Sequence, residues 1–275
     1  MGGAPVTGRL WQLWRYPVKS MLGETLGAAT VDERGVAGDR RLALVDHATG
    51  RVASAKQPRL WRGLLTVRAA GAAPDPVRLT LPDGTVLSTM DDEVDAVLSG
   101  LLGRAVRLTG AVPDDAVLDR ADPDAVLSAG VTAVTPTTPS RLGGAAPPGS
   151  LVDFAPLHLV ATATLAALGS VDAVRYRPNL VVESSGPAFE ENGWVGRELR
   201  VGAELVLRVV APTPRCAVPP LAHGTLPPDA AALRAPARLN RVVPLPALGP
   251  QPCVGAYAVV TRPGRVEVGD PVEVR

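Results

Sequence analysis

Short runs of alternating apolar and polar residues cover most of residues 9–89. They include "LWQLWRYPV", "RRLALVD" and "VRLTLPDGTVLS", and glycine, proline and aspartate separate them. Alternation at every second residue is typical of half-buried β-strands, and the "PDG" at 82–84 between two such runs predicts a hairpin. Because the short strands follow one another without crossover helices, they predict a barrel or sandwich rather than a parallel sheet.

Two segments predict short helices. Residues 91–102 begin with three acidic residues and lead to a glycine, which matches the helix dipole and a C-terminal stop. The run "TATLAALGS" predicts a second helix with Thr162 or Thr164 as its N-cap and Gly169 as its stop. Residues 229–250 leave two interpretations open, a helix at the front or a mostly irregular proline-rich loop.

The composition changes between residues 120 and 150. The run "AVTPTTPSRLGGAAPPGS" is typical of loops and has little apolar periodicity. After it the strand pattern returns in "NLVVESS", "ELRVGAELVLRVVAP" and "VGAYAVVTRPGRVEVGDPVEV". We therefore expect a β-dominated α+β protein with an N-terminal domain at 1–120 and a C-terminal domain at 121–275, where 121–150 is a linker or active-site loop.

Charge and hydropathy exclude several classes of partner. The chain has 275 residues, is 46% hydrophobic and carries a formal net charge of +1, with its basic and acidic residues mixed. This distribution provides no basic stripe for nucleic acid and no cluster for a membrane surface. The sequence has no long apolar run and no signal-peptide pattern at its start, so a cytoplasmic protein is expected.

Lysine and cysteine are the informative rare residues. Arginine supplies every basic side chain except Lys19 and Lys56, a bias typical of a GC-rich genome such as that of an actinobacterium. Cys216 lies among four prolines in "APTPRCAVPP", which predicts a stiff turn, and the adjacent Arg215 would favour its thiolate. A small buried hydrophobic side chain is the alternative interpretation. Cys253 is expected in the core, and a disulfide between the two is not expected in a reducing compartment.

Several motifs, in order along the chain, carry a family resemblance. "LWRYPVKSMLG" at 13–23, "GVAGDRRLALVD" at 35–46, "RYRPNLVV" at 175–182, "PTPRC" at 212–216 and the run at 254–272 resemble the MOSC proteins, named after the C-terminal domain of molybdenum cofactor sulfurase. The amidoxime-reducing enzymes of bacteria and mitochondria are the most similar members. The resemblance implies a MOSC β-barrel, a smaller N-terminal β-barrel-like domain and a few short helices.

The resemblance also implies a site. It assigns a molybdenum-molybdopterin cofactor whose metal is ligated by Cys216, which is then also the catalytic residue. The residues at cofactor-contacting positions are Lys19, Ser20, Arg40, Arg177 and Asn179, with Arg215 and Thr162 in addition. Lys56 and Gln57 either line the same pocket or form a solvated strand end. The three histidines, His47, His158 and His223, show no ligand spacing and receive no role.

The activity implied is two-electron reduction of N-hydroxylated compounds such as amidoximes and hydroxylamines. Electrons would come from an external donor, a flavin reductase, a ferredoxin or a cytochrome b5-like protein, because the sequence lacks the ferredoxin-like domain of some bacterial relatives. Two alternatives stay open: a sulfur carrier that uses a persulfide on Cys216, and a protein that binds the cofactor without turnover. No pyridoxal phosphate site is expected, since neither lysine lies in the required strand–helix context.

Overall fold

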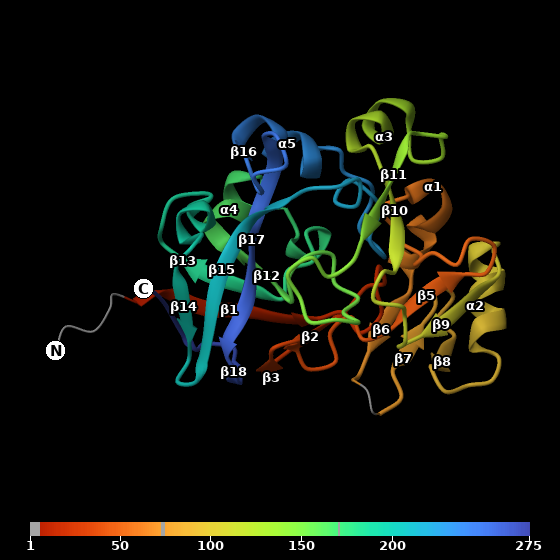
Figure 1. Cartoon of the computed structure of the whole chain (residues 1–275), viewed down its shortest axis with the longest axis horizontal. Helices are drawn as coiled ribbons and strands as arrows, with labels where there is room; N and C mark the ends of the chain where they lie inside the picture. Colours follow the sequence, from red (N-terminus) through yellow and green to blue (C-terminus); the bar gives the residue numbers. More distant parts are fainter. Residues whose placement is uncertain (1–5, 73–74, 170) are drawn as a thin grey trace.

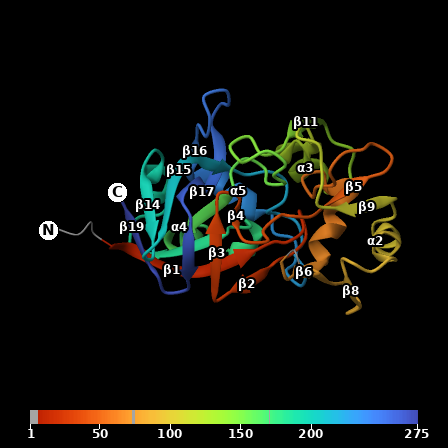
Figure 2. The same cartoon turned by 60° about the horizontal axis from the view of Figure 1, so that its bottom comes forward.

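The computed structural model describes residues 6–72, 75–169 and 171–275 of the chain. A closed β-barrel and a smaller mixed lobe lie side by side in both views (Figure 1 and Figure 2). The C-terminal strand lies on the side of the barrel that faces away from the smaller lobe. In the described residues, no helix combines the length and the apolar character needed to cross a membrane.

Seven strands close the barrel in the order β12–β13–β1–β19–β14–β15–β17, and β17 pairs again with β12. These strands are β1 (Val6–Arg15), β12 (Leu157–Ala161), β13 (Leu180–Ser184), β14 (Glu198–Val201), β15 (Leu205–Pro214), β17 (Gln251–Arg262) and β19 (Pro271–Val274). Neighbours run antiparallel except β12 and β13, which are parallel. β2 (Glu24–Leu26) pairs with β1 and β16 (Arg241–Val242) with β17. The expected β-dominated barrel fold is confirmed.

Apolar residues at every second strand position fill the barrel. On β15, Leu205, Leu207 and Val209 all face this core and are almost completely buried. The same alternation places Leu157 and Leu159 of β12 inside. Burying a leucine or valine side chain contributes about 1.5–3 kcal/mol relative to exposure, so this period-two pattern fixes the register of the sheet.

The smaller lobe is built from two short sheets and three helical segments. One sheet pairs β5 (Ala43–Asp46) with β9 (Val106–Thr109), and the other has the order β6 (Arg68–Ala70), β7 (Arg78–Thr80), β8 (Val86–Ser88). The helices are α1 (Pro58–Trp61), the 3-10 turn η1 (Arg62–Thr66) and α2 (Val94–Leu102). Trp61, Leu64 and Leu98 pack together in its core. The hairpin predicted at "PDG" is the β7–β8 pair, which confirms that prediction.

Strands from the start of the chain pair with strands from its end. β1 lies between β13 and β19, and β3 (Ala28–Asp32) pairs with both β18 (Gly264–Glu267) and β4 (Gly35–Val36). The segment 6–36 is therefore hydrogen-bonded into the C-terminal half, although it precedes the smaller lobe in sequence. The expected division at residues 120 and 121 stays a prediction.

The segment expected to be a linker or loop has regular structure. β10 (Val117–Ala121) and β11 (Thr137–Arg141) form an antiparallel ribbon, and α3 (Pro123–Ala129), which connects them in sequence, lies at the end of this ribbon (Figure 1). The Asp122 carboxylate accepts a hydrogen bond from the amide of Ala125, and Pro123 occupies the first helical turn. Both are ordinary helix-start signals that the proline- and glycine-rich composition of the segment obscured.

The other helices correct or refine the expectations. α2 begins at Val94, three residues later than predicted, and ends before Gly103, which has a φ of 64°. α4 (Thr162–Ala167) begins after Ala161 and has no side-chain cap, so the predicted threonine cap is wrong. The Thr164 hydroxyl instead donates to Glu191, because both groups are buried. α5 (Ala231–Leu239) confirms the helical interpretation at the front of 229–250. Two further 3-10 turns are η2 (Ala173–Arg175) and η3 (Glu190–Trp194).

Candidate functional site

A cavity lies where the turn after β15 meets the β10–β11 ribbon and the ends of the first barrel strands; it and its opening to solvent enclose about 790 Å³ of empty space. It is lined by Lys19, Ser20, Arg40, Ser54, Lys56, Arg120, Val152, Asp153, Ala155, His158, Arg175, Tyr176, Arg177, Asn179, Pro214, Arg215, Cys216, Val218, Pro219 and Tyr257. Seven of the eight residues proposed from the sequence are on this wall, from three separate parts of the chain. The eighth, Thr162, is not, and its hydroxyl accepts a hydrogen bond from the amide of Ser184.

The wall of this cavity is strongly cationic. Seven of its described lining residues are lysine or arginine, and one, Asp153, is an acid. A concave surface with an excess of one charge concentrates ligands of the opposite charge, because low-dielectric walls focus the field. The cavity therefore fits an anionic ligand.

Three of the site residues have left-handed backbone conformations. Ser20, Arg40 and Arg177 have φ angles of 65°, 46° and 55°, and Phe189 is the one other non-glycine residue with positive φ in the described chain. Non-glycine residues adopt this region at an energetic cost, so surrounding contacts must hold them there. Strain that coincides with cavity-lining side chains is typical of functional sites.

Two guanidinium groups lie over the buried ring of Tyr16. The Cζ atom of Arg177 is 4.3 Å and that of Arg40 4.9 Å from the ring centroid. The Asp39 carboxylate pairs with Arg40 and also accepts a hydrogen bond from the Tyr16 amide, at 2.7 Å. Burial, followed by the charge of Arg40, lowers the pKa of Arg177 to about 10. Holding these two positive charges close together in a buried place costs electrostatic free energy, and a bound anion would reduce that cost.

One buried nitrogen of these two arginines has no hydrogen-bond acceptor among the described residues of the protein. Arg40 donates to the side-chain oxygen of Asn179 at 3.3 Å and to the carbonyl of Arg177 at 3.2 Å. Arg177 donates through Nη1 to the carbonyl of Met21 at 2.6 Å, but its Nη2 is buried without a partner. A buried donor without an acceptor is costly, so this nitrogen marks where a ligand acceptor fits.

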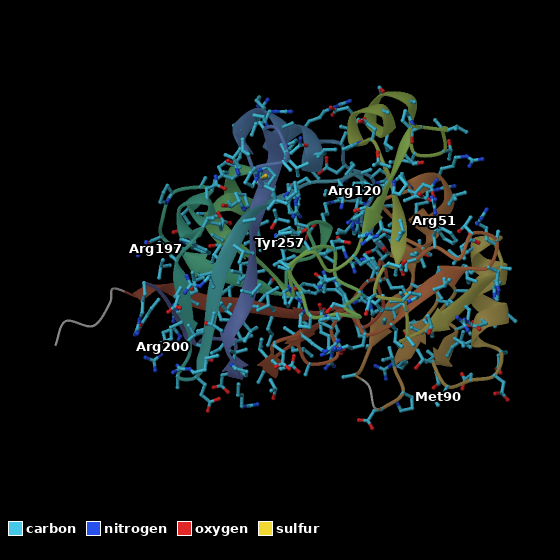
Figure 3. The ribbon with its side chains drawn as sticks, viewed as in Figure 1. Arg51, Met90, Arg120, Arg197, Arg200 and Tyr257 are labelled. Carbon is cyan, nitrogen blue, oxygen red and sulfur yellow. The ribbon has the colours of Figure 1, made fainter. Side chains whose placement is uncertain are left out.

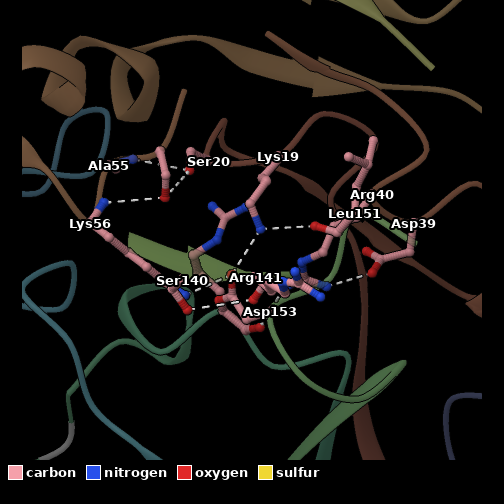
Figure 4. A network of polar contacts seen from close by, with 12 residues as sticks. Lys19, Ser20, Asp39, Arg40, Ala55, Lys56, Ser140, Arg141, Leu151 and Asp153 are labelled. Atoms are coloured by element: carbon pink, nitrogen blue, oxygen red, sulfur yellow. Dashed lines mark hydrogen bonds and ion pairs between the residues drawn. The ribbon is translucent and has the colours of Figure 1, made fainter. Parts of the chain in front are cut away.

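The two lysines meet at a single carboxylate (Figure 4). Lys19 and Lys56 lie 2.8 Å and 2.7 Å from Oδ1 of Asp153, and Lys19 also donates to the carbonyl of Leu151. Burial lowers the pKa of Lys19, and it lowers that of Lys56 to about 8, although Asp153 opposes both shifts. The two ammonium groups hold the pKa of Asp153 well below its usual value despite its burial. The structure therefore gives Lys56 a place on the cavity wall, whereas Gln57 does not line it.

Cys216 follows the last residues of β15 and is partly exposed to the cavity. Its side chain packs against an apolar cluster of Ala55, Leu65, Val218 and Leu221. The turn that follows is held by Arg175 of the RYRPN motif. The thiol is thereby fixed on one side and open to the cavity on the other.

Arg175 anchors the turn after Cys216. Its buried guanidinium donates to the carbonyls of Pro219, Leu221 and Pro227, at 3.4, 2.9 and 2.6 Å. Arg215 lines the cavity, yet its guanidinium donates to the main-chain carbonyls of Thr213 and Tyr176. Both arginines therefore also brace the protein backbone around the thiol.

Sequence reasoning missed several lining residues. In the segment 152–168 it favoured Thr162, but the polar side chains that this segment places on the wall are Asp153 and His158. Burial lowers the pKa of His158 well below its usual value, and its Nε2 lies 3.1 Å from the carbonyl of Val254, so the ring is neutral and donates there. Arg175 had a local signal, since it stands two residues before Arg177 in one motif. Asp153 had none because its partners Lys19 and Lys56 are distant in sequence, and Arg120 had none because it lies at the start of a segment whose composition predicted a loop.

The remaining cysteine and histidines lie away from the cavity wall. Both cysteines are free, and Cys253 is fully buried, which confirms its predicted place in the core. Burial raises the pKa of the Cys253 thiol to about 11. His223 is buried, and its Nδ1 lies 2.9 Å from the carbonyl of Leu221.

Two family models match most of the chain. Residues 7–117 match the model of the MOSC N-terminal beta barrel domain, and residues 146–273 match that of the MOSC domain. A crystal structure of the YuaD protein from Bacillus subtilis is similar over 97% of this chain and 94% of that chain, with 12% identity and a TM-score of 0.42. A crystal structure described as an hypothetical protein covers 43% of this chain and 50% of that chain, with 18% identity and a TM-score of 0.30. A search of curated proteins gave no match.

Proposed function

This chain belongs to the MOSC-domain proteins with an N-terminal MOSC β-barrel domain, and from that premise we propose that it is a molybdenum-cofactor-dependent reductase of N-hydroxylated compounds. The family is associated with molybdenum cofactor binding. The observation that carries the proposal is a partly exposed thiol, Cys216, in a cavity with seven cationic side chains on its wall.

The residues present fit such a cofactor. A molybdenum-pterin carries a phosphate, and the orphaned Nη2 of Arg177 is a donor suited to one of its oxygens. Arg40 and Lys19 supply further positive charge to the phosphate, and Asn179 and Ser20 offer polar groups to the pterin edge. A thiolate is the soft ligand that suits a thiophilic metal, so Cys216 would hold the molybdenum.

When bound, the cofactor supplies two-electron oxygen-atom transfer, which the protein side chains cannot perform. In the overall reaction an amidoxime takes up two electrons and two protons, its N–O bond breaks, and an amidine and water result. The electrons require an external donor protein, a flavin reductase, a ferredoxin or a cytochrome b5-like protein. We place the reaction in the cytoplasm, where both cysteines would stay reduced.

The side chains of this chain bind, orient and hold protons. Arg175 fixes the turn after Cys216, which would help to hold the thiol in place as a metal ligand. Lys56 holds a proton on Nζ beside Asp153 at neutral pH, within the same cavity as the thiol. His158 stays neutral, so lysine and arginine side chains supply the positive charge of the wall.

A sulfur carrier would use the same cysteine differently. A persulfide that is passed to another protein requires a thiol that can leave its pocket, whereas Cys216 packs against four apolar residues and precedes an anchored turn. These contacts favour a metal ligand over a carrier.

The test is a single-turnover reaction with protein from a host that makes molybdenum cofactor. Samples reduced by dithionite are mixed with benzamidoxime under argon, and benzamidine is quantified against bound molybdenum. The proposal predicts close to one benzamidine per molybdenum in the wild type and none in Cys216→Ala. The matched control is Cys253→Ala, which removes the other thiol from the core and should retain the reaction. Molybdenum-loaded wild type that forms no benzamidine, or any benzamidine from Cys216→Ala at the wild-type yield, would contradict the proposal.

A further inference from the structure

The seven cationic side chains of the cavity differ in their contacts. Six of them make hydrogen bonds or ion pairs within the protein: Lys19, Arg40, Lys56, Arg175, Arg177 and Arg215. The seventh, Arg120, makes neither with any residue in the described part of the chain. A guanidinium on a cavity wall that no protein group engages is available to a ligand.

The strand that carries Arg120 directs it to the cavity. Its neighbour Asp119 pairs with Arg51, on the opposite face of β10. Leu118, two residues before Arg120 and therefore on the same face, packs with Leu151, which directly precedes the cavity-lining Val152 and Asp153. Figure 3 places Arg120 at the junction of the two lobes, between the barrel strand that carries Tyr257 and the smaller lobe.

The charge of Arg120 acts on the thiol end of the cavity. It is among the causes that lower the pKa of Lys56 to about 8 and that of Asp153 below its usual value. Lys56, Tyr257 and Cys216 line the same cavity as Arg120. Arg120 is therefore close to the groups around the thiol, where a substrate would be bound.

A carboxylate is the anion that this arrangement fits. The planar guanidinium presents paired donors that match the two oxygens of a carboxylate. In the proposed function, Arg177, Arg40 and Lys19 supply the positive charge for the cofactor phosphate, and Asp153 engages both lysines. Among the described cations of the wall, Arg120 is the one without a hydrogen bond or ion pair, so its paired donors face the cavity without an acceptor.

We infer that Arg120 binds a carboxylate group of the substrate, so that the enzyme selects N-hydroxylated compounds that carry a carboxylate. This inference rests on the proposed function, because it concerns the substrate of the same site. It makes Arg120 a specificity-determining residue that contacts the substrate away from the N–O bond.

The test compares two probes with the same reacting group, 4-carboxybenzamidoxime and benzamidoxime. Dissociation constants are measured by calorimetry on cofactor-loaded full-length protein without electron donor, so that binding is read without turnover. Arg120→Gln removes the charge, Arg120→Lys retains it, and Arg197→Gln, an exposed arginine on the far side of the barrel (Figure 3), controls for net charge. kcat/KM is then measured for both probes, and molybdenum content for every variant.

In Arg120→Gln we expect affinity for the carboxylate probe to fall by about 10- to 100-fold, as expected for loss of a charge-assisted hydrogen bond, while benzamidoxime binds as before. Arg120→Lys should recover part of the loss, and Arg197→Gln should match the wild type. Equal losses for both probes, or no loss for either, would overturn the inference. Reduced molybdenum content in Arg120→Gln would assign the arginine to the cofactor instead. Carboxylate-selective binding without reduction of either probe would contradict the proposed function and leave the role of Arg120 supported.

Discussion

Lys19 and Lys56, the two lysines of the chain, both contact the same carboxylate oxygen of Asp153, at 2.8 Å and 2.7 Å. The lysines come from different motifs of the N-terminal half, and Asp153 comes from the segment that leads into β12. Because both ammonium groups are buried, the shared carboxylate offsets part of the cost of removing their charges from water. One carboxylate therefore pairs with both lysine ammonium groups on the cavity wall.

Removing that acid should destabilise the fold. We expect Asp153→Asn to lower the free energy of unfolding by about 2–3 kcal/mol at pH 7, less than for a fully buried pair because Asp153 is 32% exposed. Urea denaturation measures the change. The exposed Asp115 supplies the control, and Asp115→Asn should lie within about 0.5 kcal/mol of the wild type. Equal effects of the two substitutions would show that the shared contact contributes nothing.

The lysine Nζ groups can be observed directly. Protein labelled with ¹⁵N-lysine has two side-chain signals, and the Lys56 signal should titrate near pH 8, well below the usual lysine pKa of 10.5. The folded protein releases this proton near pH 8 and the unfolded chain near 10.5, so stability should rise with pH between these values. In Arg120→Gln the pKa of Lys56 should move upward, since a nearby positive charge is lost. A Lys56 signal that titrates at 10.5 would refute the account of its burial.

The turn after Cys216 should loosen when Arg175 is shortened. Arg175→Lys retains the charge but cannot reach the carbonyls of Pro219, Leu221 and Pro227 together. We expect faster amide hydrogen exchange at His223 and Gly224, whose amides bond within this turn and to Leu65, and a loss of about 1–3 kcal/mol in stability. Arg234→Lys on the exposed side of α5 is the control and should leave exchange in the turn unchanged.

Much of the fold followed from local pattern, but the cavity did not. Period-two alternation predicted the barrel strands, and "PDG" predicted the β7–β8 hairpin, because both depend on neighbouring residues. The pairing of Lys19 with Asp153 spans 134 positions and has no local signal. Arg120 reaches the wall on a ribbon within a segment whose proline and glycine content predicted a loop. Contacts between segments that are distant in sequence determine both the Lys19–Asp153 pair and the position of Arg120.

Acid should destabilise the protein through His223. Burial lowers the pKa of His223 to about 4 from its usual 6.5, so the unfolded state binds a proton between these pH values that the folded state does not. The stabilisation is complete above pH 6.5 and is lost as pH falls toward 4, by up to about 3 kcal/mol. His223→Gln should show a smaller decrease over this range than the wild type.

The exposed His47 provides the comparison for that experiment. His47→Gln should keep the full acid-dependent decrease in unfolding free energy, because the buried His223 is intact in that variant. If the His47 and His223 variants lose stability along the same curve, burial of His223 does not set the acid response.

The central claim is that Cys216 holds molybdenum, and the most direct measurement is metal content by mass spectrometry of purified protein. Wild type, Cys216→Ala and Cys253→Ala are prepared from one host that makes the cofactor, and persulfide is assayed on the same samples. The account predicts close to one molybdenum per chain in the wild type and in Cys253→Ala, and a large loss in Cys216→Ala. Wild-type protein without molybdenum that carries a persulfide on Cys216 would contradict it and favour a sulfur carrier.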